Sequence, residues 1–146
     1  MAKSLLLLLA LLLGFGQAHA YLTEANPSPG AVLETQPGLI SLTMSEGVEL
    51  KFSLFKIYRL DPIPEDKKEL ARAAKALLAE KIKLRNDEAE RADTGLIEPQ
   101  DRSTVIKLGL KEGLEPGLYI IMWKVLSVDS HSSEDFSYFI YQPAQP

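Results

Sequence analysis

Cysteine is absent from this chain, and its absence excludes several kinds of chemistry. Without a thiol there is no cysteine nucleophile, no thiolate metal site and no disulfide. A domain of this size must therefore be held together by its hydrophobic core alone. The 146 residues predict a single domain.

Several other common features are missing. The formal net charge is -4 and no basic cluster is present, which argues against binding to nucleic acid or to an anionic membrane. The chain has no G-x-S-x-G turn, Walker loop or dinucleotide-binding glycine pattern, so we do not expect a hydrolase. Beyond the N-terminal segment, no stretch is long and apolar enough to span a bilayer.

The N-terminal segment is typical of a secretory signal peptide. Lys3 precedes an apolar run over residues 5–13, and small residues follow that run. Cleavage after Ala20 fits the A-x-A rule better, and cleavage after Ala18 also places small residues at both required positions. We expect an exported protein, periplasmic or otherwise extracytoplasmic, whose mature chain has no membrane span.

Most of the mature chain predicts short strands separated by turns. Proline and glycine mark turns in NPSPG, QPG and KEGLEPG. Apolar and polar residues alternate between these turns, so that Tyr119, Ile121, Trp123 and Val125 fall on one side of their strand. The spacing predicts a mostly β protein, an immunoglobulin-like Greek-key β-sandwich or barrel of about seven strands.

The segment over residues 64–91 has a different composition. It is rich in Ala, Leu, Glu and Lys, and it contains no glycine and no internal proline. Apolar residues recur in it at helical spacing: Leu70, Ala74, Leu77 and Leu84. We expect one long helix, or two helices broken near Asn86, in an insertion over about residues 62–95. The apolar stripe is interpreted as packing across the sandwich, the alternative being a docking surface for a partner.

The chain has only two histidines, His19 and His131. Asp129 lies two residues before His131, so in an extended chain both side chains point the same way. A D-x-H sequence at a strand end is also typical of a solvated turn. If cleavage follows Ala18, however, His19 becomes the first residue, and its free amine and imidazole can chelate one ion. Three nitrogens and an oxygen suit Cu(II), with zinc as an alternative.

Three stretches of the sequence match the pattern of one family. HAYLTEANPSPGA resembles the opening HAxLxxSxPAxGA, and LISLTMSEGV resembles a strand written LxFSExV. The most specific stretch is EPGLYIIMWKVLSVDSH, which resembles PGxYxVxWxVxSxDxH. These stretches lie near both ends of residues 19–146, and together they resemble the CopC family of periplasmic copper-binding proteins.

The resemblance implies a site and a role. Its copper ligands fall on His19, Asp129 and His131, and an acid found near the site in some members falls on Glu46, either beside the ion or weakly bound to it. This implies one Cu(II) ion per chain, cleavage after Ala18, and a carrier for copper storage, delivery or resistance. A membrane copper-transport protein is the partner that the resemblance suggests, and we expect a monomer.

The sequence also departs from the family pattern. Residues 132–135, SSED, stand where the family often has proline or glycine, and the helical segment is longer than the loop expected there. Only Met44 and Met122 remain after residue 18, so no methionine Cu(I) site is expected.

Two other functions stay open at this stage. An N-terminal histidine chelate with a second histidine is also the copper site of oxidative polysaccharide-cleaving enzymes. A carboxylate from Asp129 would favour Cu(II) over the reduced state that oxygen chemistry needs, which makes an oxidase or oxygenase the weaker hypothesis. The third hypothesis is a metal-free immunoglobulin-like interaction module with the helix as its contact surface.

Overall fold

The structure is a computed structural model that describes residues 19–146. The predicted signal peptide over residues 1–18 lies outside the described residues. No helix in the described part of the chain is long and apolar enough to cross a membrane.

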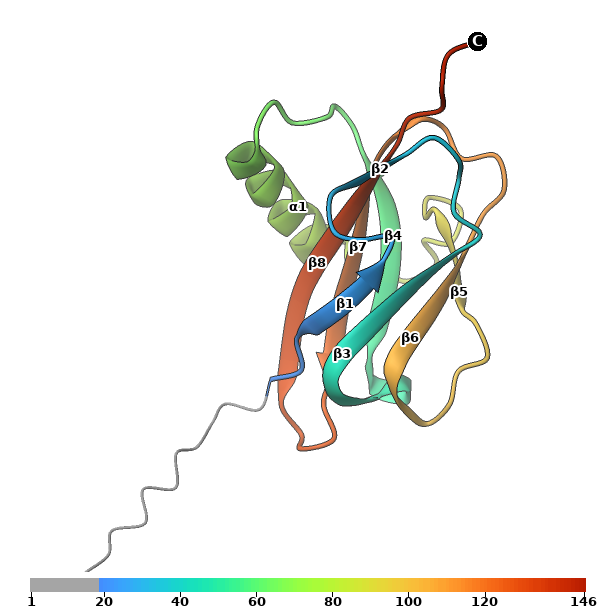
Figure 1. Ribbon diagram of the computed structural model, residues 1–146. Helices are drawn as coiled ribbons and strands as arrows, with labels where there is room; N and C mark the ends of the chain where they lie inside the picture. The colour runs from blue at the N-terminus through green and yellow to red at the C-terminus, as the bar shows by residue number, and fades with distance from the viewer. Residues whose placement is uncertain (1–18) are drawn as a thin grey trace, which may run out of the picture.

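Two four-stranded sheets face each other, and a helix lies against the outer face of the second sheet (Figure 1). The first sheet has the order β1-β3-β6-β5, formed by Leu22–Asn26, Leu39–Glu49, Arg102–Leu110 and Asp93–Leu96. The second has the order β2-β8-β7-β4, formed by Ala31–Leu33, Ser132–Tyr141, Gly117–Leu126 and Leu54–Leu60. A short 3₁₀ turn, η1 (Leu50–Phe52), joins β3 to β4.

The predicted fold class is therefore confirmed, with eight strands in residues 19–146 where the sequence predicts about seven. Strand β2, which pairs in parallel with β8, has only three residues. So short a strand cannot show an alternating pattern in the sequence. A tyrosine corner of the kind found in β-sandwiches is also present, because the hydroxyl of Tyr119 donates to the carbonyl oxygen of Glu115 at 2.5 Å.

Strand β7 is buried on both faces. The side chains predicted to share one side lie in the core between the two sheets: Tyr119, Ile121, Trp123 and Val125. The alternate side chains lie in a second apolar cluster, beneath the helix: Leu118, Ile120 and Met122. The helix thus completes the burial of this strand. Without the helix, the apolar side chains on that face of the sheet would be exposed to solvent.

Both methionines of the described chain are buried. Met44 lies in the core between the sheets, whereas Met122 lies in the cluster beneath the helix. The absence of a Cu(I) site stays a prediction.

The helix α1 (Lys67–Lys81) begins where the sequence favours it. Asp66 is its N-cap, and Oδ1 of Asp66 accepts a hydrogen bond of 2.8 Å from the backbone N–H of Glu69. The buried positions Ala74, Leu78 and Ile82 pack on the second sheet. The interpretation that the apolar stripe packs across the sandwich is confirmed.

The predicted extent of the helix is wrong at its C-terminal end. The helix ends at Lys81, about ten residues before the predicted limit, and Asn86 adopts a left-handed conformation with φ of 58°. The ammonium group of Lys56 on β4 donates to the carbonyl oxygens of Lys81 and Leu84, at 2.9 and 2.7 Å. These bonds satisfy carbonyl groups that a longer helix would use internally. Leu84, assigned to the apolar stripe, is 43% exposed.

A buried ion pair anchors the segment after the helix. Nζ of Lys56 lies 2.8 Å from Oδ2 of Asp87, which also accepts a hydrogen bond from the hydroxyl of Tyr58. Burial alone would raise the pKa of Asp87, but the hydrogen bonds from Lys56 and Tyr58 outweigh it and lower that pKa to about 2. The insertion is therefore joined to β4 by charge as well as by apolar packing.

Candidate metal centre

The turn between β7 and β8 carries two of the predicted ligands, Asp129 and His131. Ser127 opens the turn, and its backbone N–H donates to the carbonyl oxygen of His131 at 2.8 Å. Ser130 closes the turn in a left-handed conformation, with φ of 73°. The turn is attached to the first sheet, because the N–H of Val128 donates to the carbonyl oxygen of Gly47 at 3.0 Å.

One oxygen of Asp129 is the centre of a group of hydrogen bonds. Oδ1 accepts from the hydroxyl of Ser127, from the backbone N–H of His131 at 3.2 Å, and lies 3.2 Å from Nδ1 of His131. The bond from Ser127, with those from His131, lowers the pKa of Asp129 below its usual range. The carboxyl group is therefore in the anionic form that a metal ion requires.

The chain segment that carries His19 is attached to both sheets. The N–H of Tyr21 donates to Oγ of Ser45 at 3.0 Å, and the N–H of Ser45 donates to the carbonyl oxygen of Tyr21 at 2.7 Å. On the other side, the hydroxyl of Ser133 on β8 donates to the carbonyl oxygen of Ala20 at 2.8 Å. Residues 20–21 are thus fixed between β3 and β8, which brings His19 to the end of the molecule where the β7–β8 turn lies (Figure 1).

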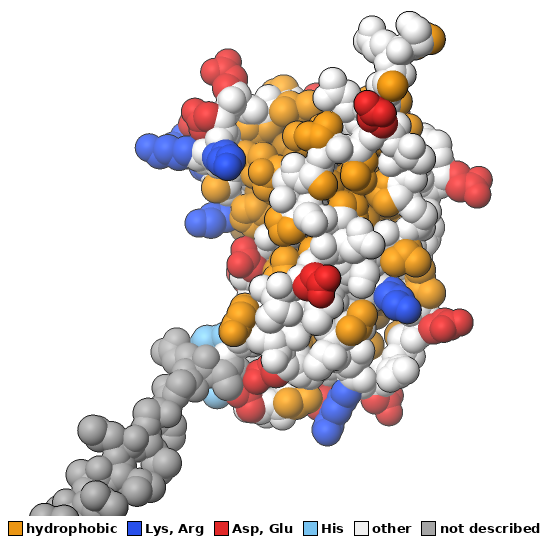
Figure 2. Space-filling view, in the orientation of Figure 1, with side chains coloured by type: hydrophobic (Ala, Val, Ile, Leu, Met, Phe, Trp, Pro, Cys, Tyr) orange, Lys and Arg blue, Asp and Glu red, His pale blue; other side chains and the backbone are white. Residues whose placement is uncertain are grey.

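The two histidines meet at this end. The ring centroids of His19 and His131 are 5.4 Å apart and the ring planes are inclined at 75°. The residues lie 112 positions apart in the sequence, so their contact is a product of the fold. Figure 2 shows the histidine side chains together at the lower left of the molecule, with acidic side chains beside them.

Two buried polar atoms of the predicted ligands have no hydrogen-bond partner among residues 19–146: Nδ1 of His19 and Oε1 of Glu46. Glu46 lies on β3 between Ser45, which is bonded to Tyr21, and Gly47, which is bonded to the β7–β8 turn. A buried polar atom without a partner costs free energy, about 1–3 kcal/mol. An imidazole nitrogen and a carboxylate oxygen are both atoms of the kind that bind a cation.

The two histidines meet, but the predicted ligands do not form a finished site. Within the described range no group of three or more histidine, aspartate or glutamate side chains is arranged so that it could hold a metal ion. The nitrogen of His19 is still in a peptide bond with Ala18 in the full sequence. Its amine can become a ligand only when that bond is cleaved, and the contacts of Asp129 and Glu46 with an ion remain predictions.

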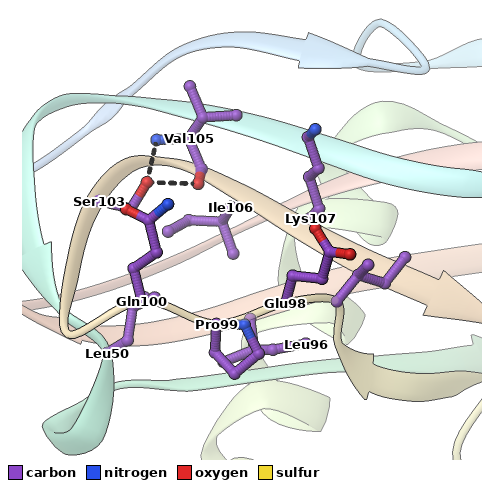
Figure 3. A pocket seen from close by; sticks show the side chains of 10 residues that line it. Leu50, Leu96, Glu98, Pro99, Gln100, Ser103, Val105, Ile106 and Lys107 are labelled. Atoms are coloured by element: carbon purple, nitrogen blue, oxygen red, sulfur yellow. Dashed lines mark hydrogen bonds between the residues drawn. The ribbon is translucent and has the colours of Figure 1, made fainter.

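One hollow of the described surface lies away from the candidate ligands. A hollow of about 330 Å³ opens between η1 and the loop from β5 to β6, and Figure 3 shows residues that line it. Its Ser103 hydroxyl is already occupied, since it donates to the carbonyl oxygen of Val105 at 2.7 Å and accepts from the N–H of Val105 at 3.1 Å. None of the predicted ligands lines this hollow.

The structure also places residues that the sequence reading did not single out. Ser127 and Ser133 hold the two segments that carry the candidate ligands. Ser127 stands in the family-like stretch SVDSH, which was a signal that this serine has a role. Ser133 offers no comparable signal, because its partner Ala20 is 113 residues away.

Comparisons with known proteins identify the family of this chain. The family model described as "CopC domain" matches residues 64–142, a range that includes Asp129 and His131 but not His19 or Glu46. Protein YobA of Escherichia coli strain K12 is 35% identical over 117 residues, which cover 80% of this chain and 73% of YobA. The chain belongs to the CopC family.

One more relative and two solved structures extend the comparison. The copper transport protein CutJ of Bacillus subtilis is 25% identical over 128 residues, which cover 87% of this chain but only 19% of CutJ. The crystal structure of CopC from Methylosinus trichosporium OB3b superposes with a TM-score of 0.59 at 22% identity, covering 88% of this chain and 98% of that one. The copper resistance protein PcoC of Escherichia coli gives a TM-score of 0.57 at 18% identity, covering 86% of this chain and all of PcoC. These solved structures confirm the CopC fold.

Proposed function

We propose that this CopC-family protein is an exported Cu(II) carrier that binds one copper ion at the contact between its N-terminus and the β7–β8 turn. The ligands in this proposal are the amine and imidazole of His19, the carboxylate of Asp129 and the imidazole of His131. Glu46 stands beside the ion or binds it weakly. The names of CutJ and PcoC, which concern copper transport and copper resistance, support copper as the cargo.

The contact between the two histidine rings is the observation that carries the proposal. An edge-on approach of two imidazoles at 5.4 Å leaves room for one ion to be shared by their nitrogens. The unpartnered Nδ1 of His19 supports this, since amine and Nδ1 of one N-terminal histidine close a six-membered chelate ring. Borderline nitrogen donors with one carboxylate suit Cu(II), which heads the affinity order of the divalent metals.

The proposal includes no catalytic step. A carboxylate beside the two imidazoles favours the oxidised ion, so the set of donors suits holding Cu(II) more than reducing it for oxygen chemistry. Cleavage after Ala18 then has a second consequence besides export, because it creates the chelating amine. The site would be complete only outside the cytoplasm, in the periplasm or an equivalent compartment, where a membrane copper-transport protein could receive the ion from a monomeric carrier.

The test is a Cu(II) titration of protein that begins at His19, followed by competition with a chelator and by electron paramagnetic resonance. Three chains are compared: the mature protein, His131→Ala, and a chain with one extra glycine before His19. The extra glycine keeps both imidazoles and removes only the terminal amine chelate, which makes it the matched control. Quenching of Trp123 fluorescence offers a second readout.

We expect one Cu(II) per mature chain, with much weaker binding in both altered chains. Equal binding with and without the extra glycine would remove the amine from the ligand set. If the mature protein bound no copper and its thermal midpoint did not change with stoichiometric Cu(II), the carrier proposal would fail, because a ligand that binds only the folded state must stabilise it. The metal-free interaction module would then be the better explanation.

A further inference from the structure

We propose that Ser127 is a positioning residue of the metal centre. Its hydroxyl holds Oδ1 of Asp129, so that Oδ2 is the carboxylate oxygen presented to the ion. This inference rests on the proposed function, because it assumes that Asp129 binds copper.

The backbone of Ser127 is fixed independently of its hydroxyl. The residue is 1% exposed and directly follows β7, and it forms an isolated bridge with Val48 of β3. Its N–H donates to the carbonyl oxygen of His131 at 2.8 Å, and its carbonyl oxygen accepts from the N–H of Ser130 at 2.9 Å. These backbone bonds close the turn, and they would survive if the side chain were replaced.

The hydroxyl of Ser127 has two acceptors within reach. One is Oδ1 of Asp129, and the other is the carbonyl oxygen of His131 at 3.0 Å. The hydroxyl has a single hydrogen, and an ionised carboxylate is the stronger acceptor. The carbonyl oxygen already receives the backbone N–H of Ser127, so the hydroxyl is available to the carboxylate.

The two oxygens of Asp129 are consequently unequal. Oδ1 accepts from Ser127 and from the N–H of His131, and it lies 3.2 Å from Nδ1 of the same histidine. No hydrogen bond reaches Oδ2 from any residue between 19 and 146. With its lone pairs in use, Oδ1 is a poor ligand, and Oδ2 is left to the metal.

The same arrangement restrains the ring of His131. Nδ1 of His131 lies 3.2 Å from Oδ1 of Asp129, so a carboxylate that Ser127 holds in place also restricts where the ring can lie. Contacts of this type, in which a carboxylate orients a metal-binding imidazole, usually change metal affinity about 10- to 100-fold when their support is removed. Ser127 fixes the carboxylate and, through it, the ring.

The test uses a matched pair of variants, Ser127→Thr and Ser127→Val. Threonine keeps the hydroxyl and valine replaces it with a methyl group of similar shape, so the two changes strain the buried position alike. Ser127→Ala is the smaller change, and Ser132→Ala is the control within the same hairpin. Ser132 is exposed and its side chain makes no hydrogen bond to the described residues. Each mature protein is titrated with Cu(II), and the bound ion is examined by electron paramagnetic resonance with pulsed detection of the imidazole nitrogens.

We expect Ser127→Val and Ser127→Ala to raise the Kd for Cu(II) about 10- to 100-fold and to show more than one copper signal. Ser127→Thr should retain a single signal and most of the affinity, and Ser132→Ala should match the parent. If valine and threonine bound copper equally well with the same spectrum, while His131→Ala still lost copper, the role of Ser127 would be refuted and the carrier proposal would stand. Failure of the parent protein itself to bind copper would refute both.

Discussion

At the scale of single residues, the metal centre depends on side chains that bind nothing themselves. The hydroxyl of Ser127 donates to Asp129 and the hydroxyl of Ser133 donates to the carbonyl oxygen of Ala20, so each bonds to a different part of the candidate site. The chelating residue His19 would stand at a chain end, which is the most mobile kind of position unless other contacts fix it. The bond from Ser133 to Ala20 is such a contact, one residue away.

The change Ser133→Ala should therefore weaken copper binding without unfolding the domain. Loss of the 2.8 Å bond to Ala20 frees the terminal segment on its β8 side, and a bond of this kind contributes about 0.5–1.5 kcal/mol. We expect up to about a tenfold rise in the Kd for Cu(II), and faster amide exchange in residues 20–22. Ser132→Ala is the control, and unchanged affinity in Ser133→Ala would show that the bonds to Ser45 hold the segment alone.

Residue type, spacing and the resemblance to the CopC pattern were together enough to propose His19, Asp129 and His131, because the chain has only two histidines and no cysteine. The structure brings the two histidines into contact, whereas their binding of copper stays a prediction. The serines could not be chosen in the same way. Serine is common in turns for many reasons, and only the tertiary pairing of β8 with the segment before β1 shows what Ser133 bonds to.

At the scale of elements, the helix was predictable in kind but not in length. Composition and spacing predict a helix over residues 64–91, and the N-cap Asp66 fits that prediction. Its end at Lys81 depends on Lys56, which lies 25 residues earlier on β4. A local pattern cannot reveal such a long-range contact. The same limit explains why the sequence assigned Leu84 to the buried stripe.

Two leucine substitutions test which apolar residues of the helical segment are buried: Leu78, which the structure buries, and Leu84, which the sequence assigned to the buried stripe. Leu78 is 6% exposed beneath α1, so Leu78→Ala should lower the free energy of unfolding by about 2–5 kcal/mol. Leu84 is 43% exposed, so Leu84→Ala should cost well under half as much. Urea unfolding followed by Trp123 fluorescence measures both. Equal losses would mean that the helix continues past Lys81 in solution and buries Leu84.

At the scale of the whole molecule, the buried pair of Lys56 and Asp87 connects the insertion to the stability of the domain. The pair lies on the helix-covered side of the second sheet, and the candidate ligands are carried by the β7–β8 turn and the segment before β1. Among the contacts found in residues 19–146, no hydrogen bond or ion pair joins the pair of Lys56 and Asp87 to the candidate ligands. A change in the pair should therefore alter global stability and leave the intrinsic copper affinity unaltered.

Acid titration of the metal-free protein tests this. The pKa of Asp87 is about 2 in the folded protein and about 3.9 in an unfolded chain, so its ionisation stabilises the fold fully above pH 4. That contribution, about 2–3 kcal/mol, is lost as the pH falls from about 4 to 2. Asp87→Asn should lose less stability than the parent protein between pH 4 and pH 2. At pH 7 the same variant should be less stable than the parent by about 3–5 kcal/mol, because Lys56 keeps a buried charge without its partner.

The double change Lys56→Met with Asp87→Asn removes both charges and should recover part of the stability at pH 7 that the single change loses, because the carbonyl oxygens of Lys81 and Leu84 still lose their donor. Urea unfolding at several pH values gives the free energies, and a Cu(II) titration at pH 7 checks the site. We expect the same copper affinity in all three proteins. An acid slope in Asp87→Asn equal to that of the parent would mean that other carboxylates, and not Asp87, set the acid stability. A copper affinity that followed the stability of the variants would mean that the helix-covered face and the metal centre are coupled through β7, the strand that both of them share.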